Sequence, residues 1–216
     1  MDFNLCFPEG SCAYHFTSAA VDAGALTKSE FNLVKDFAPS RIGDFARGRD
    51  CARRALARLG CHSAEILKGD HNEPLWPSGF SGSISHAKDI TGAVVARSAG
   101  LKSLGLDIEH LGRVKPGMWD LLFSEAEKAF LLTLDSEQQD IYCTAFFSMK
   151  ESFYKMQFPL TTTSLWFHDV EIRGKDEAFE ITVIKEFEAK KELPELTPMH
   201  FIQSGSLIIS SCYLEA

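Results

Sequence analysis

Two acidic residues stand two positions apart in an otherwise apolar segment, GLDIE at 105–109. In a β-strand, alternate side chains point to the same face, so a strand here places Asp107 and Glu109 side by side. Two carboxylates this close raise each other's pKa unless a cation lies between them. Oxygen ligands of this kind suit Mg²⁺ or Mn²⁺ rather than Zn²⁺. The pair suggests a metal site, and the alternative is a solvent-exposed strand face with two ordinary acids.

A third acid follows further along the chain, in the segment FSMKESFYK at 147–155. Glu151 and Lys155 are four residues apart and share one face of a predicted helix. Lys150 lies about 100° round that helix, but its long side chain could reach the same anion. If the helix faces the strand, three acids with lysines nearby suit metal-assisted phosphate chemistry. Otherwise Glu151 and Lys155 form an ordinary surface pair, which contributes little.

A local cluster of arginines contrasts with the net charge of −8, which argues against general nucleic-acid binding. Six of the nine arginines fall within 18 residues, at positions 41, 47, 49, 53, 54 and 58. Arg49 and Arg53 are four residues apart, on one helical face, and arginine is well matched to terminal phosphates. The alternative is a solvated basic helix face.

The segment GSISH at 82–86 adds a hydroxyl and an imidazole. Ser85 and His86 are adjacent in a predicted strand, so their side chains point to opposite faces; a single histidine in a strand is often only a core residue. The sequence contains no G-x-S-x-G, no Walker A motif and no G-x-G-x-x-G, so it supports neither a hydrolase nucleophile elbow nor those phosphate-binding loops.

The elements expected to position these residues give a mixed α/β pattern with a midpoint near residues 100–105. Ser29 is expected to cap the first helix, and Ser124 with Glu127 has the spacing of a capping box. Helices are expected at 29–37, at 41–59, from 124 onward and at 138–157. Strands are expected at 82–86, 91–96, 104–109, 165–173, 178–184 and 206–214.

Composition limits the class of protein further. The six cysteines form no C-x-x-C pair, which suggests reduced cysteines in a cytosolic protein. The N-terminal segment MDFNLCFPEGSC has neither the basic nor the apolar region of a signal peptide. No stretch approaches the roughly 18 apolar residues that a membrane span needs.

Taken together, these motifs resemble the 4′-phosphopantetheinyl transferases of the Sfp type, and most of all the siderophore branch typified by enterobactin synthetase component D. The family pairs G-x-D-x-E with W/F-S-x-K-E-S-x-x-K, and the branch adds G-R-x-x-A-R and P-x-W-P followed by G-S-I-S-H. Here these motifs stand at 105–109, 147–155, 48–53, 74–77 and 82–86. One departure is Asn72, where the family often has glycine; asparagine tolerates a left-handed backbone better than most residues.

The resemblance implies an α/β (α+β) fold of two similar halves, 1–103 and 104–216, about a pseudo-twofold axis, with the active site in the cleft between them. The first half would contact the 3′-phosphate and adenine of coenzyme A, and the second would carry the metal and the catalytic acids. The implied reaction moves 4′-phosphopantetheine from coenzyme A to a serine of an apo carrier protein and releases adenosine 3′,5′-bisphosphate.

The resemblance also assigns residues. Asp107, Glu109 and Glu151 would hold Mg²⁺ or Mn²⁺. Glu151, or a metal-bound water, would take the proton of the incoming serine, and Lys155 would steady or protonate the leaving phosphate. The residues expected to contact coenzyme A are Arg49, Arg53, Pro74, Ser85, His86, Lys150 and Lys155.

The resemblance also implies a surface that docks the carrier, an oligomeric state and a location in the cell. Met118, Trp119 and Leu121 are expected to form an apolar patch that docks the carrier, unless Trp119 begins the next helix and packs inward. A cytoplasmic monomer that acts on peptidyl or aryl carrier domains is expected, with polyketide or fatty-acid carriers as the alternative and peripheral association with a synthetase complex left open. Two rival functions are a metal-dependent phosphohydrolase of small nucleotides and a non-catalytic carrier-binding protein.

Overall fold

The computed structural model describes residues 5, 7–62, 65–175 and 178–216. The chain divides into two compact units. Unit 1 comprises Phe7–Leu104 and Glu215–Ala216, and unit 2 comprises Leu5 and Gly105–Leu214. The division falls inside strand β6 (Leu101–His110), so this strand runs from one unit into the other. From the sequence, the boundary was placed between 103 and 104.

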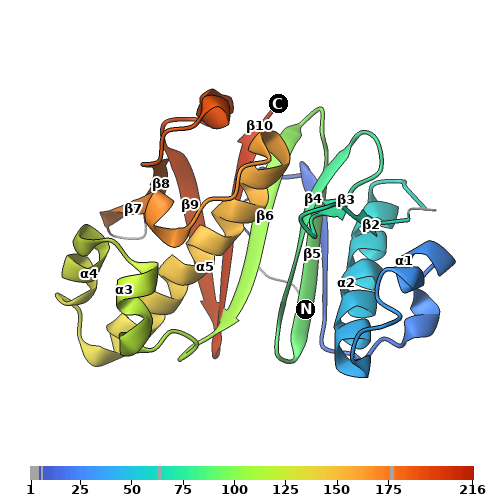
Figure 1. Ribbon diagram of the computed structural model, residues 1–216, viewed down its shortest axis with the longest axis horizontal. Helices are drawn as coiled ribbons and strands as arrows, with labels where there is room; N and C mark the ends of the chain where they lie inside the picture. The colour runs from blue at the N-terminus through green and yellow to red at the C-terminus, as the bar shows by residue number, and fades with distance from the viewer. Residues whose placement is uncertain (1–4, 6, 63–64, 176–177) are drawn as a thin grey trace. The chain divides into compact units, whose positions relative to one another are not determined.

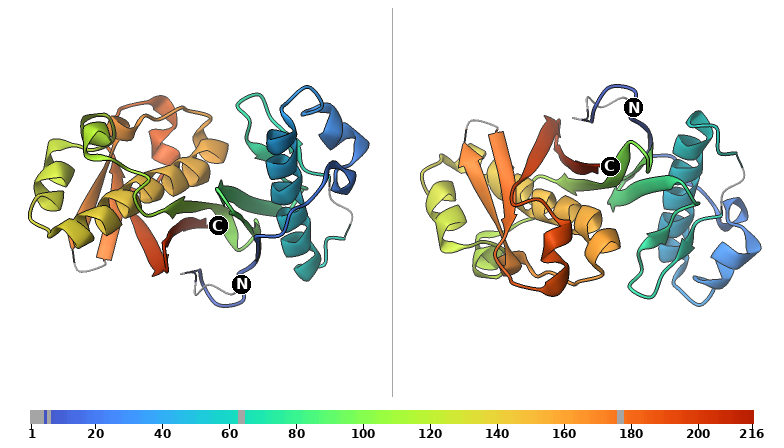
Figure 2. Two further views of the ribbon diagram at one scale, coloured as in Figure 1. Left: turned by 90° about the horizontal axis from the view of Figure 1, so that it is seen from below. Right: turned by 90° about the horizontal axis from the view of Figure 1, so that it is seen from above.

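Unit 1 is built on an antiparallel sheet with the order β1-β5-β4 (Figure 1). Its strands are β1 (Cys12–Thr17), β4 (Phe80–Ala87) and β5 (Ile90–Arg97), with a small hairpin of β2 (Leu67–Lys68) and β3 (Pro74–Leu75). Its helices are η1 (Ala23–Ala25), α1 (Lys28–Asn32) and α2 (Pro39–Arg58). The long helix α2 lies along the sheet in both further views (Figure 2).

Small side chains let α2 approach its sheet closely. Cys51, Ala52, Ala55 and Leu56 are fully buried and share a core cluster with Ala93 and Val95 of β5. A Cβ atom added to Gly48 would lie 3.1 Å from a side-chain methyl of Ile84. The helix expected at 41–59 is therefore confirmed, and its glycine belongs to the contact with β4. The helix expected at 29–37 is shorter, because Thr27 rather than Ser29 caps α1 and the helix ends at Asn32.

Unit 2 contains a five-stranded sheet with the order β6-β10-β9-β8-β7. Besides β6, its strands are β7 (Val170–Lys175), β8 (Ala178–Val183), β9 (Thr197–Ser204) and β10 (Leu207–Glu215). Its helices are η2 (Pro116–Met118), α3 (Trp119–Leu122), α4 (Glu125–Leu131), α5 (Ser136–Thr161), η3 (Phe167–Asp169) and η4 (Glu188–Glu192). The capping box of Ser124 and Glu127 is confirmed at the start of α4.

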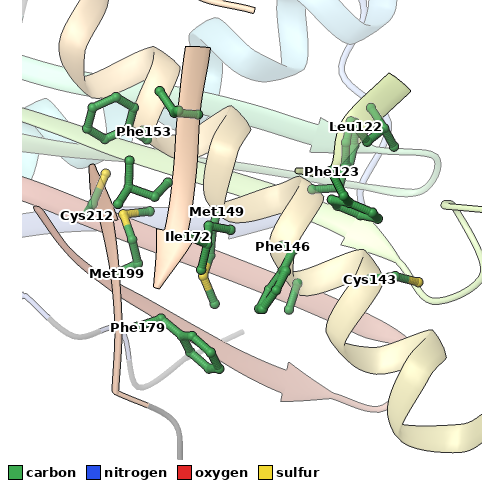
Figure 3. Packing of buried hydrophobic residues seen from close by; sticks show 14 of the residues in the cluster. Leu122, Phe123, Cys143, Phe146, Met149, Phe153, Ile172, Phe179, Met199 and Cys212 are labelled. Atoms are coloured by element: carbon green, nitrogen blue, oxygen red, sulfur yellow. The ribbon is translucent and has the colours of Figure 1, made fainter. Parts of the chain in front are cut away.

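The core of unit 2 forms where α5 packs against the sheet (Figure 3). Phe146, Met149 and Phe153 of α5 are at most 2% exposed, and Phe146 packs edge-on against Phe179 of β8. Asp135 caps the helix by accepting from the backbone N–H of Gln138. This helix is longer than the expected 138–157 at both ends.

Gly105 lets α5 approach β6 to a distance that no other residue allows. A Cβ atom at this position would lie 1.9 Å from the backbone oxygen of Ser152, so any side chain would push the helix away from the strand. The glycine of G-x-D-x-E therefore serves packing, and that packing brings Asp107 to the helix.

Some expected strands differ in the structure. The stretch 165–173 is mostly not strand, because η3 precedes β7 and β7 begins only at Val170. Strands β1 and β9 were missed, since their sequences, CAYHFT and TPMHFIQS, alternate poorly. Within the described residues, no helix is long and apolar enough to cross a membrane.

Candidate functional site

Asp107 forms the centre of a polar cluster between β6 and α5. Its side chain is almost completely buried, and Oδ1 lies 2.7 Å from Nζ of Lys155. Lys155 also donates to the backbone oxygen of Leu106 at 3.2 Å. The long helix does face the strand, which is the contact that the chemistry of these acids requires.

A buried serine holds the other oxygen of this carboxylate, and a second buried serine contacts the first. The hydroxyl of Ser148 donates to Oδ2 of Asp107 at 2.9 Å and lies 2.8 Å from the hydroxyl of Ser210 on β10. Both serines are 0% exposed. Sequence reasoning missed Ser210 because nothing in the alternation of β10 distinguishes it from its neighbours.

Glu109 and Glu151 lie within the electric field of Asp107. Burial, then the charge of Asp107, raises the pKa of Glu109 to about 7, although Arg113 and Lys155 oppose this. Burial also raises the pKa of Glu151, with Lys155 lowering it and Asp107 raising it further. Arg113 lies 3.7 Å from Glu109, an ion pair too long for a hydrogen bond. The cluster therefore has more negative charge than its cations offset at close range.

The donor set fits a hard divalent cation in its chemistry, since it offers only carboxylate oxygens. Raised pKa values at two of the acids show that added positive charge would stabilise their ionised forms. Across the described part of the chain, however, no three His, Cys, Asp or Glu side chains already converge closely enough to hold a metal. The counter-charge beside Asp107 is the ammonium of Lys155.

Lys150 has a structural role, contrary to the prediction that it reaches a shared anion. Its ammonium is buried and donates to Oε2 of Glu127 at 2.7 Å and to the backbone oxygens of Leu122 and Phe167, each at 2.9 Å. These three acceptors satisfy its three N–H donors. The side chain is 1% exposed, so no donor remains to bind a phosphate.

An apolar hollow of about 320 Å³ adjoins Glu151 within unit 2. Its lining includes Tyr154, Leu165, Trp166, Phe167 and Val170. Trp166 is 74% exposed at this site. A ligand with an uncharged, partly apolar chain fits this lining better than a phosphate does.

A second hollow, of about 450 Å³, lies within unit 1 and is rich in cations. Arg41 and Arg49 of α2, Lys68 of β2 and His86 of β4 all line it, together with Asp44, which pairs with Arg47. Three permanent positive charges around one hollow favour a phosphate. Sequence reasoning missed Arg41 and Lys68; Arg41 lies eight positions before Arg49 in the same helix, but no residue pattern pointed to Lys68.

Arg49 is held in place on three sides. Its Nε donates to the backbone oxygen of Ile66 at 2.8 Å, its Nη2 lies 3.3 Å from the backbone oxygen of Leu67, and the guanidinium stacks 4.0 Å from the centre of the Phe45 ring. Burial lowers its pKa to about 10, so it stays charged near neutral pH. A fixed, poorly solvated guanidinium gains strongly from a bound anion.

Two residues expected at this site lie elsewhere among the described residues. Arg53 is engaged by Glu30, whose two oxygens lie 2.8 and 2.9 Å from Nη1, and by the backbone oxygen of Ala25. Ser85 is buried on the face of β4 opposite to His86 and does not line the hollow. Arg49, His86 and Pro74 do line it.

The loop before Pro74 has the conformation that glycine would give. Asn72 has φ 72°, in the left-handed region, and its N–H donates to the backbone oxygen of Gly69 at 3.0 Å. The expectation that asparagine maintains this turn is confirmed. Asn72 also lines the cationic hollow.

The expected docking patch is mostly turned inward. Trp119 begins α3, packs against Phe123 and the core, and its Nε1 is buried with no hydrogen-bond partner among the described residues. Met118 packs against the same core. Leu121, by contrast, is 66% exposed, so of these three side chains it presents the most exposed apolar surface, while Met118 and Trp119 are half-buried.

Family comparison covers most of both units. Residues 29–96 match the 4′-phosphopantetheinyl transferase N-terminal domain, and residues 103–195 match the 4′-phosphopantetheinyl transferase superfamily. A holo-(acyl-carrier-protein) synthase of Bacillus anthracis, solved in complex with CoA (3′,5′-ADP), aligns with 55% of this chain and 96% of that chain. Its sequence identity is 18% and its TM-score 0.41, too low for residues to be compared.

Curated relatives agree with the family match. A 4′-phosphopantetheinyl transferase of Streptomyces mobaraensis is 36% identical over 73% of this chain and 65% of that protein. One of Mycobacterium tuberculosis is 38% identical over 66% of this chain and 63% of that protein. Enterobactin synthase component D of Salmonella typhi is 31% identical over 53% of this chain and 47% of that protein. The chain spans less than two thirds of the length of these relatives. It belongs to the 4′-phosphopantetheinyl transferase superfamily.

Proposed function

We propose that the protein transfers 4′-phosphopantetheine from coenzyme A to a serine of an apo carrier-protein domain and releases adenosine 3′,5′-bisphosphate. The observation that carries this proposal is the contact between Asp107 and Lys155, which joins the two signature motifs of the family into one cluster with Glu109 and Glu151 nearby. The cationic hollow of unit 1 supports the proposal independently.

The cationic hollow is proposed to take the 3′-phosphate of coenzyme A. Arg49 is fixed and poorly solvated, and Arg41, Lys68 and His86 line the same hollow. The backbone around Asn72 and Pro74 would contact the adenine, since both residues line the hollow as well. Arg53 and Ser85 are no longer needed as ligands in this proposal.

Asp107, Glu109 and Glu151 are proposed to hold Mg²⁺, with Mn²⁺ as the alternative. When bound, the ion would supply positive charge against the pyrophosphate of coenzyme A. Ser148, itself in contact with Ser210, holds the Asp107 carboxylate in one orientation, which limits the reorganisation that ligand binding requires.

Proton transfer is assigned to Glu151, the acid of the cluster that lies four residues before Lys155 in the same helix. The hydroxyl oxygen of the carrier serine attacks the phosphorus that bears the pantetheine, and its proton passes to Glu151. The bond from that phosphorus to the bridging oxygen breaks, and adenosine 3′,5′-bisphosphate leaves. Lys155 donates to the departing phosphate.

The apolar hollow beside Glu151 is proposed to receive the pantetheine arm. Tyr154 and Trp166 offer apolar surface together with polar atoms that can contact the amides of the arm. Leu121 remains the proposed contact for an apolar helix face of the carrier, because 66% of its surface is exposed.

The carrier class is the finer part of the proposal. The motifs shared with the siderophore branch and the similarity to enterobactin synthase component D favour aryl and peptidyl carrier domains. Polyketide and fatty-acid carriers remain the alternative, because the identities of 36% and 38% to transferases whose names state no carrier exceed the 31% to enterobactin synthase component D. A monomeric state and a cytoplasmic location are carried over from the family resemblance.

The test is intact-mass spectrometry of apo aryl, peptidyl and fatty-acid carrier domains incubated with the protein, coenzyme A and Mg²⁺. The expected result is a gain of one phosphopantetheine mass on the aryl or peptidyl domain, abolished by EDTA. Hydrolysis of coenzyme A without any gain of mass on a carrier would instead favour the metal-dependent phosphohydrolase.

A further inference from the structure

Unit 1 contains a fully buried acid, Glu30 of α1. Glu30 is 0% exposed and accepts four hydrogen bonds. Its Oε1 lies 2.8 Å from Nη1 of Arg53 and 2.9 Å from the backbone nitrogen of Ile66. Its Oε2 lies 2.9 Å from the same Nη1 and 3.0 Å from the backbone nitrogen of Thr27. A buried carboxylate is tolerated only with such complete pairing.

From Glu30, a continuous series of contacts leads to the hollow. The N–H of Ile66 donates to Glu30, and the backbone oxygen of Ile66 accepts from Nε of Arg49 at 2.8 Å. Leu67 accepts from the same guanidinium, and the next residue, Lys68, lines the hollow together with Arg49. Glu30 therefore fixes the backbone that both orients Arg49 and carries Lys68.

We propose that Glu30, held by Arg53, is a positioning residue for the binding of a phosphate ester in the cationic hollow. Arg53 contributes by holding the Glu30 carboxylate and does not touch the phosphate. This inference rests on the proposed function, in which the 3′-phosphate of coenzyme A occupies that hollow.

Unit 2 contains the same arrangement without the cationic hollow, which provides a matched control. Glu127 is the third residue of a capping box, as Glu30 is, and it is fully buried. It pairs with Lys150 of the long helix 23 residues later, the same separation as between Glu30 and Arg53. It accepts from the backbone nitrogen of Ile172 at 2.7 Å, as Glu30 does from Ile66.

Arg53 could bind the phosphate directly or could only hold Glu30, and these two roles predict opposite effects of Glu30→Gln on phosphate binding. If Arg53 were a direct phosphate ligand, loss of the Glu30 charge would free its guanidinium and leave phosphate binding equal or stronger. If Glu30 positions the hollow, the same change loosens Ile66 and with it Arg49 and Lys68, so phosphate binding weakens.

The experiment is isothermal titration of the full chain with adenosine 3′,5′-bisphosphate and with adenosine 5′-phosphate. The variants are Glu30→Gln, Arg53→Lys, the double variant and Glu127→Gln, each shown by calorimetry to be folded at the titration temperature. Glu30→Gln is expected to weaken the bisphosphate about tenfold, as the loss of a buried hydrogen-bond partner does, and to leave the monophosphate unchanged. Arg53→Lys is expected to act in the same direction, and the double variant to add little, because the two residues work as one unit.

Glu127→Gln is expected to lower the melting temperature but to keep the wild-type preference for the bisphosphate. Should Glu30→Gln keep or increase that preference, the positioning role is wrong and Arg53 is a direct ligand. Where Glu30→Gln does not fold, an unchanged preference in Arg53→Lys likewise overturns the positioning role. If the wild-type protein binds the bisphosphate and the monophosphate equally well, the hollow does not bind the 3′-phosphate. That outcome overturns the proposed function of the hollow, and it differs from an effect seen only in the variants.

Discussion

Asp107 is the acid whose charge the fold controls most closely, because Lys155 and Ser148 hold its two oxygens. Asp107→Asn retains the shape and an acceptor for Ser148 but removes the negative charge. We expect transfer to fall by about 100-fold or more, as for other groups that stabilise transition-state charge. The cost in stability should be about 1–3 kcal/mol, because Lys155 loses its partner. Carrier modification rates and urea unfolding measure the two effects.

Asp120→Asn is the control for that substitution. Asp120 is an acid of the same unit whose side chain is 92% exposed and paired with Lys128, and exposed pairs contribute little. Its loss should leave both transfer and unfolding nearly unchanged. If Asp107→Asn and Asp120→Asn changed the transfer rate equally, Asp107 would not belong to the active site.

Substitution of Lys150 is predicted to reduce mainly the stability of the fold, and substitution of Lys155 mainly the activity. Lys150→Met leaves the buried carboxylate of Glu127 without its cation, which should cost about 3–5 kcal/mol. Lys155→Met should reduce transfer with a smaller loss of stability, because this side chain is 26% exposed. Adding Glu127→Gln to Lys150→Met should restore part of the stability, as denaturant unfolding can show. If Lys150→Met instead kept normal stability but bound coenzyme A poorly, Lys150 would be an anion ligand and its structural role would be wrong.

Glu109 predicts a pH dependence. Its pKa is about 7 in the folded chain, against an ordinary value of 4.5, so its full contribution to stability is present below about pH 4.5 and is lost as the pH rises through 7. The melting temperature of the wild type relative to Glu109→Gln should therefore fall over this range. Mg²⁺ should reverse the loss above pH 7, since a metal binds the deprotonated acid. If the difference in melting temperature between the wild type and Glu109→Gln stayed constant with pH, the pKa of Glu109 would not be raised.

Residue types and spacing predicted the acid cluster, but burial decided the role of each cation. Lys150 and Lys155 both looked like phosphate ligands in one motif, and the structure satisfies all three donors of Lys150 inside the protein. Arg53 was likewise expected at a phosphate because nothing near it in sequence revealed Glu30, which lies 23 residues away.

At the scale of elements, the contact of α5 with β6 depends on Gly105. In Gly105→Ala, the new Cβ would lie 1.9 Å from the backbone oxygen of Ser152, so helix and strand must separate. We expect a loss of about 3 kcal/mol or more, at the upper end for overpacked cores, together with loss of transfer as Asp107 moves away from Lys155. Gly117→Ala meets nothing within 4 Å and should change unfolding by less than about 1 kcal/mol. Similar losses for both would mean that the close approach is not needed.

Elements with strong periodicity or caps were predictable, and those shaped by tertiary pairing were not. The helices α2 and α5 and the strands β4 to β6 followed from apolar spacing, and the start of α4 followed from its capping box. Strand β1 escaped because CAYHFT mixes polar and apolar residues, and it becomes a strand by pairing with β5 in the register Tyr14 to Val94. The stretch 165–173 looked like a strand, but η3 interrupts it where Asp169 accepts from the backbone nitrogen of Trp166.

Across the whole molecule, the two units follow one plan that the sequence does not show as a repeat. In each unit, the capping-box glutamate of a short helix pairs with a cation of the long helix that follows it in the chain. The residues that this plan preserves are too few and too far apart to produce recognisable self-similarity in the sequence. The units differ in chemistry, since one lines a hollow with cations and the other gathers acids.

This division of chemistry predicts where a nucleotide acts. Because the cations that would bind the 3′-phosphate all belong to unit 1, adenosine 3′,5′-bisphosphate should slow amide hydrogen exchange in α2 and in residues 65–75 more than adenosine 5′-phosphate does. Ligand binding suppresses the local openings of the segments that it contacts. Exchange in the core of α5, around Met149 and Phe153, should differ little between the two nucleotides. Mass spectrometry of peptides from each unit measures this, and a difference concentrated in α5 would place the 3′-phosphate beside the acids instead.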